Sequence, residues 1–254
     1  MSKLVALRQR SIRINNSMNI RFLELSVPTE DIRESLEFYK QLGFAELTVT
    51  DARPHQYAVV SDGRVAIGLH AEGFDEPALT FVSPNVDRRA FDLLDDGYEL
   101  DPCRIGEDAF HEIGLRSPDG HSVRFVEART YSPLHADLQP QTLLGSIAEL
   151  SIRCRDFTAA ETFWALAGLS ADDSVVADDT LIVRSPGIAL GLRDTLRSAG
   201  PILRYRVTAI EPILERLDRG NISYRSSGEE WRIVAPEGTL LVLIEDETSL
   251  VQHL

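Results

Sequence analysis

The chain repeats one sequence pattern twice, and this repeat restricts the folds that it can adopt. The tripeptide Glu-Leu-Ser at residues 24–26 recurs at residues 149–151. In each copy a helical pattern follows that ends in an aromatic pair, at residues 38–39 and 163–164. Both comparisons give a spacing of 125 residues, and two later matches give spacings of 123 and 118. The sequence therefore predicts two similar domains.

Each copy contains a smaller unit in which one helix and four strands follow in the order βαβββ. In the first unit a strand pattern at residues 21–27 precedes an amphipathic helix at about 31–41, which Gly43 ends. Three short strands follow, and the dipeptide Asp62-Gly63 is typical of a hairpin turn between the last two. The other three helices are expected near residues 86–95, 156–167 and 210–219. Four such units predict an α+β fold.

The repeat also sets the expected domain boundaries. A stretch with two prolines and few strand formers separates the copies and is typical of a linker. We expect an N-terminal arm at 1–19, a first domain at 20–130, a linker at 131–145, a second domain at 146–247 and a tail at 248–254.

Four tandem βαβββ units, with an Asp-Gly or Pro-Asp-Gly turn before a closing strand, resemble the vicinal oxygen chelate superfamily. This superfamily is also named after glyoxalase, bleomycin-resistance proteins and dioxygenases. The most specific segments are residues 25–44 and 117–127, and the resemblance covers about 225 residues. It implies two glyoxalase-like domains, each with a curved sheet that encloses a cleft. Four units in one chain is the layout of extradiol-type dioxygenases.

Composition excludes several partners. The net charge of −14 opposes binding to nucleic acid or to an anionic membrane, and no run approaches the roughly 20 apolar residues of a membrane span. Cys103 and Cys154 form no Cys-x-x-Cys pair, which is typical of reduced cysteines in a cytoplasmic protein. The expected partner is a small molecule, and a homodimer stays open.

The resemblance implies a divalent metal in the cleft, held by residues from the first and last strands of each unit. Of the matching positions, only the two glutamates carry a side chain that prefers such an ion, and arginine cannot be a ligand. We therefore expect no metal cofactor. The matching positions are Glu24, Gly68, Ala78 and Arg124 in the first copy, and Glu149, Gly191, Ile202 and Val242 in the second.

A register shift of two residues keeps the same face of a strand and changes these sets. The expected ligand-binding residues are then Glu24, His70, Thr80 and Arg124 in copy one, and Glu149, Arg193 and Arg204 in copy two. We expect an ion pair between Glu24 and Arg124 that orients a ligand, and a pair between Glu149 and either arginine of copy two. Two arginines in one cleft also suit an anionic ligand.

These patterns favour a small-molecule-binding protein of this superfamily that uses no catalytic metal, of the sequestering or resistance type. The alternative is a metal-dependent glyoxalase-like lyase or isomerase, or an extradiol-type dioxygenase. In that case Glu24 and His70 are the candidate metal ligands, and His111 is the candidate general base. No other catalytic residue is indicated.

Overall fold

The structure is a computed structural model that describes residues 20–48, 55–107, 110–128, 142–172, 179–185 and 187–245. The described residues form an α+β protein with two domains, as the sequence predicts. None of the helices that they form has the length and apolar character needed to cross a membrane. The expected N-terminal arm, the C-terminal tail and most of the expected linker lie outside the described residues.

The N-terminal domain consists of two βαβββ units in the predicted order. The first comprises β1 (Arg21–Pro28), α1 (Ile32–Gln41), β2 (Ala45–Leu47), β3 (Tyr57–Ser61) and β4 (Ala66–His70). The second comprises β5 (Ala78–Ser83), α2 (Val86–Asp95), β6 (Cys103–Arg104), β7 (Glu112–Arg116) and β8 (Ser122–Glu127).

The C-terminal domain repeats the same two units. The third unit comprises β9 (Ser146–Arg153), α3 (Phe157–Leu166), β10 (Ser170–Ala171), β11 (Thr180–Ser185) and β12 (Ile188–Arg193). The fourth comprises β13 (Ile202–Val207), α4 (Glu211–Arg219), β14 (Tyr224–Ser227), β15 (Glu230–Val234) and β16 (Leu240–Glu245).

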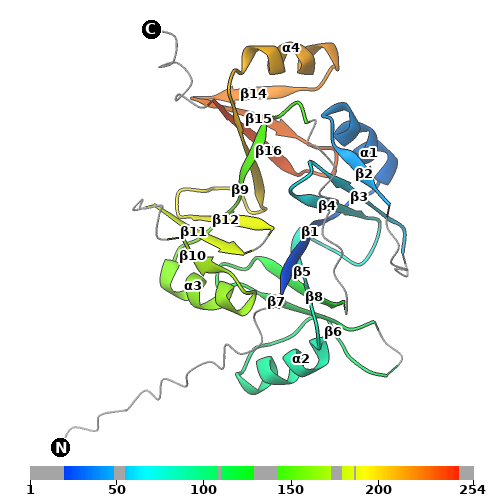
Figure 1. Cartoon of the computed structure of the whole chain (residues 1–254), viewed down its shortest axis with the longest axis vertical. Helices are drawn as coiled ribbons and strands as arrows, with labels where there is room; N and C mark the ends of the chain where they lie inside the picture. The colour runs from blue at the N-terminus through cyan, green and yellow to red at the C-terminus, as the bar shows by residue number, and fades with distance from the viewer. Residues whose placement is uncertain are drawn as a thin grey trace, which may run out of the picture.

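Each domain forms one eight-stranded mixed sheet (Figure 1). The strand order is β2-β3-β4-β1-β5-β8-β7-β6 in the first sheet and β10-β11-β12-β9-β13-β16-β15-β14 in the second. The second order equals the first with eight added to every label, so the internal repeat of the sequence corresponds to one topology used twice.

Equivalent residues begin and end equivalent helices. The side chain of Asp31 accepts hydrogen bonds from the backbone amides that open α1, and Asp156 accepts one from the amide of Ala159 in α3. Such aspartates satisfy amide groups that have no partner inside the helix. Gly43 and Gly168, at φ of 85° and 76°, follow these helices in a conformation that favours glycine. The same local chemistry thus directs both copies.

The strand register places one row of residues across each sheet. In the N-terminal sheet Glu24 of β1 lies opposite Thr80 of β5, which lies opposite Arg124 of β8. In the C-terminal sheet the same row runs from Glu149 through Arg204 to Val242. Since alternate residues of a strand point to opposite faces, these rows lie on one face of each sheet, called here the site face.

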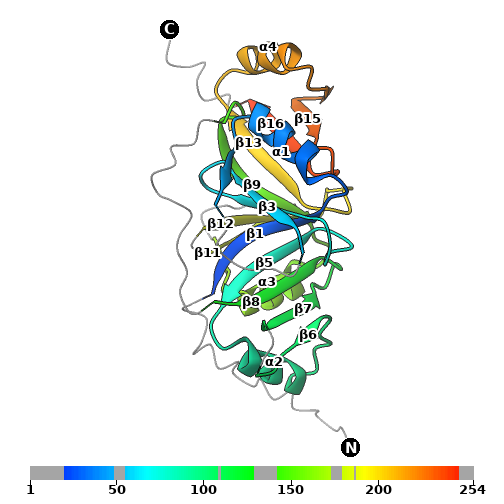
Figure 2. The same cartoon turned by 90° about the vertical axis from the view of Figure 1, so that its right-hand side faces the viewer.

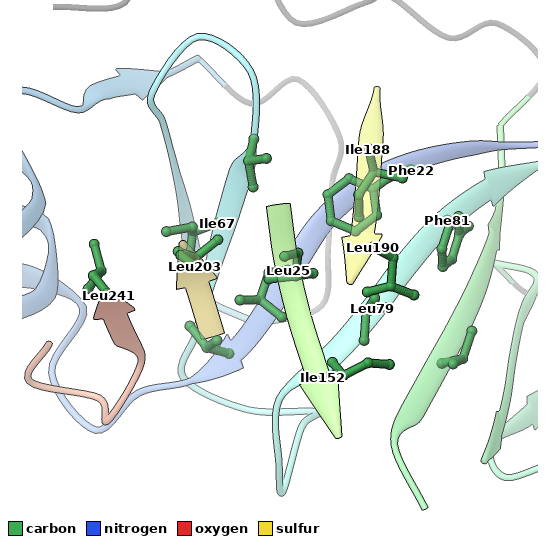
Figure 3. Packing of buried hydrophobic residues seen from close by; sticks show 14 of the residues in the cluster. Phe22, Leu25, Ile67, Leu79, Phe81, Ile152, Ile188, Leu190, Leu203 and Leu241 are labelled. Carbon is green, nitrogen blue, oxygen red and sulfur yellow. The ribbon is translucent and has the colours of Figure 1, made fainter. Parts of the chain in front are cut away.

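The opposite faces of the two sheets pack against each other and share one hydrophobic core. Figure 3 shows side chains of this cluster from both sheets. They include Leu25, Ile67 and Leu79 from the N-terminal domain and Ile152, Leu190 and Leu203 from the C-terminal domain. All six are almost completely buried. The two domains are therefore joined through their cores, with the site faces turned outwards.

Polar contacts between the domains surround this core. The hydroxyl of Tyr39 in α1 donates to Glu237 at 2.6 Å, and that of Tyr205 in β13 donates to the buried Asp62 at 3.0 Å. The guanidinium of Arg89 in α2 donates to the carbonyl of Leu166 at the end of α3. Helices α2 and α4 lie at opposite ends of the molecule, as both views show (Figure 1 and Figure 2).

Candidate functional site

Each site face carries one buried glutamate near its centre. Glu24 and Glu149 are 3% and 9% exposed, and each accepts a hydrogen bond from the serine two residues later on the same strand. A Cβ atom added to Gly68 would lie 2.5 Å from the carboxyl carbon of Glu24, and one added to Gly191 would lie 2.6 Å from that of Glu149. The carboxylates thus occupy space that only glycine leaves open on the neighbouring strand.

In the N-terminal domain Glu24 contacts a histidine. His70 Nε2 lies 2.9 Å from Glu24 Oε1, and His70 Nδ1 lies 3.0 Å from His55 Nε2. The imidazole of His70 is fully buried and stacks on the ring of Tyr57 with an interplanar angle of 3°. Glu24 and His70 therefore lie together, as the register shifted by two residues predicts. Thr80, rather than Ala78, lies opposite Glu24.

Arg124 makes its ion pair with Glu112 instead of the predicted Glu24. Its Nη1 donates to Glu112 Oε1 at 2.8 Å, and its guanidinium lies 5.0 Å above the ring of Phe74. Gly114 is the cross-strand neighbour of Arg124 on β7, and Glu112 lies two residues before it on the same face of that strand. Arg124 Nε is buried and has no hydrogen-bond partner among the described residues.

In the C-terminal domain four linked ion pairs occupy the site face. Arg193 Nε donates to Glu149 Oε1 at 2.7 Å, and this ion pair is one of the two that the sequence predicts for Glu149. Arg204 donates through Nη2 to Glu230 at 2.6 Å, and its Nε lies 3.9 Å from Glu149. Arg232 donates to the other oxygen of Glu230 at 3.0 Å. The register places Arg204, rather than Ile202, opposite Glu149.

The sequence interpretation missed Glu112, Glu230 and Arg232. A signal for the two glutamates was present, because the spacing of 118 residues that relates the turns at 117–120 and 235–238 also relates Glu112 to Glu230. Likewise, the spacing of 123 relates His70 to Arg193. The two site faces therefore carry different charged groups on one shared plan.

A cavity of about 400 Å³ lies on the site face of the C-terminal domain. Residues of β12, β13, β15, β16 and the loop after β12 line it. They are Arg193, Thr195, Leu196, Arg197, Ser198, Ile202, Arg204, Glu230, Arg232, Leu240 and Val242. Cavities of this size suit small organic molecules.

Another cavity, of about 520 Å³, lies at the junction of the domains and is wide open to solvent. Tyr98 and Arg116 line it from one domain, and Asp156 and Phe163 from the other. It contains none of the predicted site residues.

The arginines of the C-terminal site hold both glutamates in the charged form. Burial alone would raise the pKa of Glu149, but hydrogen bonds from Arg193 and Ser151 and the nearby positive charges outweigh it and lower this pKa. For Glu230, burial acts in the same direction, and the bonds from Arg232 and Arg204 again lower the pKa. Both carboxyl groups are therefore ionised near neutral pH.

This charge state predicts a pH dependence of stability. A folded-state pKa below the ordinary value of 4.5 means that the unfolded chain binds more protons, so stability falls as the pH falls below that value. Urea denaturation measures the free energy of unfolding at pH 7 and at about pH 4. The loss of this free energy between the two pH values should be smaller for the double variant Glu149→Gln/Glu230→Gln than for the unmodified protein. Equal losses for both proteins would contradict the assignment.

His111 lies away from the site faces. Its ring contacts Glu127 and the carbonyl of Gly106, and these hydrogen bonds, that of Gly106 first, raise its pKa. Glu127 points away from the site face because it alternates with Val126, and Asp87 of α2 lies nearby. The structure therefore does not bring His111 together with Glu24 and His70.

Among the described residues, the donor atoms that a divalent metal prefers are few at the centre of each site face. In the C-terminal domain the row Glu149, Arg204 and Val242 offers a single carboxylate. In the N-terminal domain Glu24 and His70 supply two donors, and His55 takes up the second nitrogen of His70. Among the described residues, Asp87, His111 and Glu127 alone bring three such donors together, and they lie elsewhere.

Comparison with protein-family models and with curated proteins finds no match. Solved structures do match. A catechol 2,3-dioxygenase is 13% identical with a TM-score of 0.54, over 89% of this chain and 92% of that one. A homoprotocatechuate 2,3-dioxygenase from Arthrobacter globiformis is 12% identical with a TM-score of 0.59, over 89% and 79%. A Mn(II)-bound glyoxalase from Novosphingobium aromaticivorans is 14% identical with a TM-score of 0.52, over 89% and 81%.

These likenesses show the fold. The chain has the vicinal oxygen chelate fold in its tandem, two-domain form, with four βαβββ units in two mixed sheets. The resemblance drawn from residues 25–44 and 117–127 is thereby confirmed at the level of fold.

Proposed function

We propose that the chain is a cytoplasmic protein that binds a small organic molecule on its site faces without a catalytic metal there. The observation that supports this proposal is the row of residues across the C-terminal sheet. A guanidinium of Arg204 lies beside Glu149 at the place where a cation would need a further donor, and Val242 ends the row. A fixed positive charge repels a metal ion and attracts anionic groups of a ligand.

The cytoplasmic location is proposed from the two cysteines. Cys103 is exposed and Cys154 is buried, and neither forms a disulfide. Unpaired cysteines are typical of a reducing compartment.

A test of the proposal measures metal content directly. Purified protein is treated with a chelator, incubated with Mn²⁺, Fe²⁺, Ni²⁺ or Zn²⁺, dialysed and analysed for bound metal. We expect no stoichiometric ion on the site faces, and we expect members of a panel of small organic molecules to raise Tm in the presence of EDTA. The variant His111→Ala is the control, because it removes one donor of the cluster Asp87, His111 and Glu127, the one group of three such donors that the described residues form.

The second candidate is a metal-dependent lyase, isomerase or dioxygenase that uses Glu24 and His70. The distance of 2.9 Å between His70 Nε2 and Glu24 Oε1 favours it, because both atoms are ones that metal ions prefer. A stoichiometric ion that persists in His111→Ala, and that Glu24→Gln or His70→Ala removes, would establish this candidate and overturn the first.

A further inference from the structure

The cavity of the C-terminal domain has an unusual charge for this chain. Four arginines and one glutamate line it, and Glu149 lies behind Arg193, so that arginines outnumber glutamates by two. The whole chain has a net charge of −14. An anion is therefore repelled by the molecule in general and attracted at this one place, which argues for a local site rather than unspecific attraction.

Several N–H groups of these guanidinium groups make no hydrogen bond within the described part of the chain. Arg204 has a side chain only 12% exposed, yet a single hydrogen bond, from Nη2 to Glu230, is found for it among the described residues. Arg193 uses Nε and Nη1, and Arg232 uses Nη2. Arg197 makes no ion pair within the part of the chain that the structure describes. The remaining N–H groups are available to an oxyanion in the cavity, which guanidinium groups bind through paired hydrogen bonds.

The two glutamates hold three of the arginines in place without a ligand. Glu230 bridges Arg204 and Arg232, and Glu149 anchors Arg193, whose Nη1 also donates to Thr180. Positions fixed in advance reduce the entropy that binding costs. The apolar side chains of Ile202, Leu240 and Val242 line the same cavity and suit the carbon skeleton of a ligand.

The N-terminal domain lacks this arrangement. At the positions of Arg193, Arg204 and Arg232 it has His70, Thr80 and Gly114, and its one central guanidinium, that of Arg124, is paired with Glu112 and covers Phe74. Among the described residues, the group of guanidinium donors that suits an oxyanion is therefore found in the C-terminal domain.

We propose that the cavity of the C-terminal domain binds a small organic oxyanion, a carboxylate or a phosphate ester, through Arg193, Arg204 and Arg232. This inference rests on the proposed function and names the chemical class of its ligand. The charged group lies among the guanidinium groups, and the apolar part lies against Ile202, Leu240 and Val242.

Isothermal titration with phenyl phosphate and with benzoate tests the inference, and benzyl alcohol serves as the uncharged probe. We expect at least one of the two anions to bind and raise Tm, with an affinity that falls as salt is added, and benzyl alcohol not to bind. Tighter binding of phenyl phosphate would identify a phosphate site, and tighter binding of benzoate a carboxylate site.

Variants locate the binding. Arg204→Met should abolish it, and Arg232→Met should weaken it about tenfold or more. Arg232 is half-exposed, so its variant keeps the test valid if Arg204→Met fails to fold. Arg184→Met is the matched control, because Arg184 is equally exposed, lies on β11 of the same domain and does not line the cavity, and it should leave affinity unchanged.

Two results would overturn the inference: no binding of either anion, or binding that the Arg204 and Arg232 variants leave unchanged. If the metal analysis finds no ion on the site faces, these results reject only the proposed class of ligand. A stoichiometric metal on the site faces rejects the proposed function itself, whatever the anions do.

Discussion

Leu203→Asp is expected to prevent both domains from folding at 25 °C. Leu203 is completely buried in the core that the two sheets share, and Tyr205 on the same face of β13 contacts Asp62 of the other domain. An unpaired carboxylate at such a site costs several kcal/mol, which approaches the total stability of about 5–15 kcal/mol of a typical protein. Circular dichroism and soluble yield measure the effect.

Two further variants make this prediction quantitative. Leu203→Ala should cost about 2–5 kcal/mol and unfold in a single transition that includes both domains, because it opens a void in their common core. Val234→Asp on β15 is the control, because Val234 is 62% exposed, and it should change stability by less than about 0.5 kcal/mol. Two separate transitions, one of them unaffected by Leu203→Ala, would show that the domains fold independently.

Glu149→Leu is expected to lower the free energy of unfolding by about 2–3 kcal/mol, since breaking a buried ion pair leaves a charge without its partner. The value is below that of a fully buried pair because Arg193 is 25% exposed. The double variant Glu149→Leu/Arg193→Met should recover at least half of the loss, because apolar side chains replace both charges. Urea denaturation of the single and double variants gives the coupling energy.

The surface pair of Lys40 and Glu46 provides the comparison. Both side chains are more than 40% exposed, so Glu46→Leu should cost no more than about 0.5 kcal/mol. If the double variant is as unstable as Glu149→Leu, the loss comes from packing rather than from the uncompensated charge of Arg193.

The topology was accessible to sequence reasoning because it depends on local signals that the chain uses twice. Asp31 and Asp156 begin equivalent helices, the Asp62-Gly63 turn joins β3 and β4, and the repeat spacings relate whole units. The helix expected at 210–219 begins one residue later in the structure, at Glu211. Such signals act within a few residues and are independent of distant partners.

The partners of the charged groups were less accessible. The alternation of strand residues was enough to bring Glu24 near His70, and Glu149 near Arg193, once a shift of two residues was allowed. The partner of Arg124 depends on strand order, because Glu112 lies on the neighbouring strand β7, two residues before the cross-strand neighbour of Arg124. A long side chain can reach several acidic groups, and the order of the strands decides among them.

The back-to-back packing of the sheets keeps the two site faces apart, so that each can bind a molecule independently of the other. Sheets packed face to face lie about 10 Å apart, so a molecule beside Arg204 and one beside His70 would have two layers of strands between them. A ligand bound on one site face would therefore not obstruct a ligand on the other, and each would enter from its own side of the molecule. Each half can therefore carry its own chemistry on its site face. The two halves do differ there, since His70 contacts Glu24 in one and Arg193 contacts Glu149 in the other.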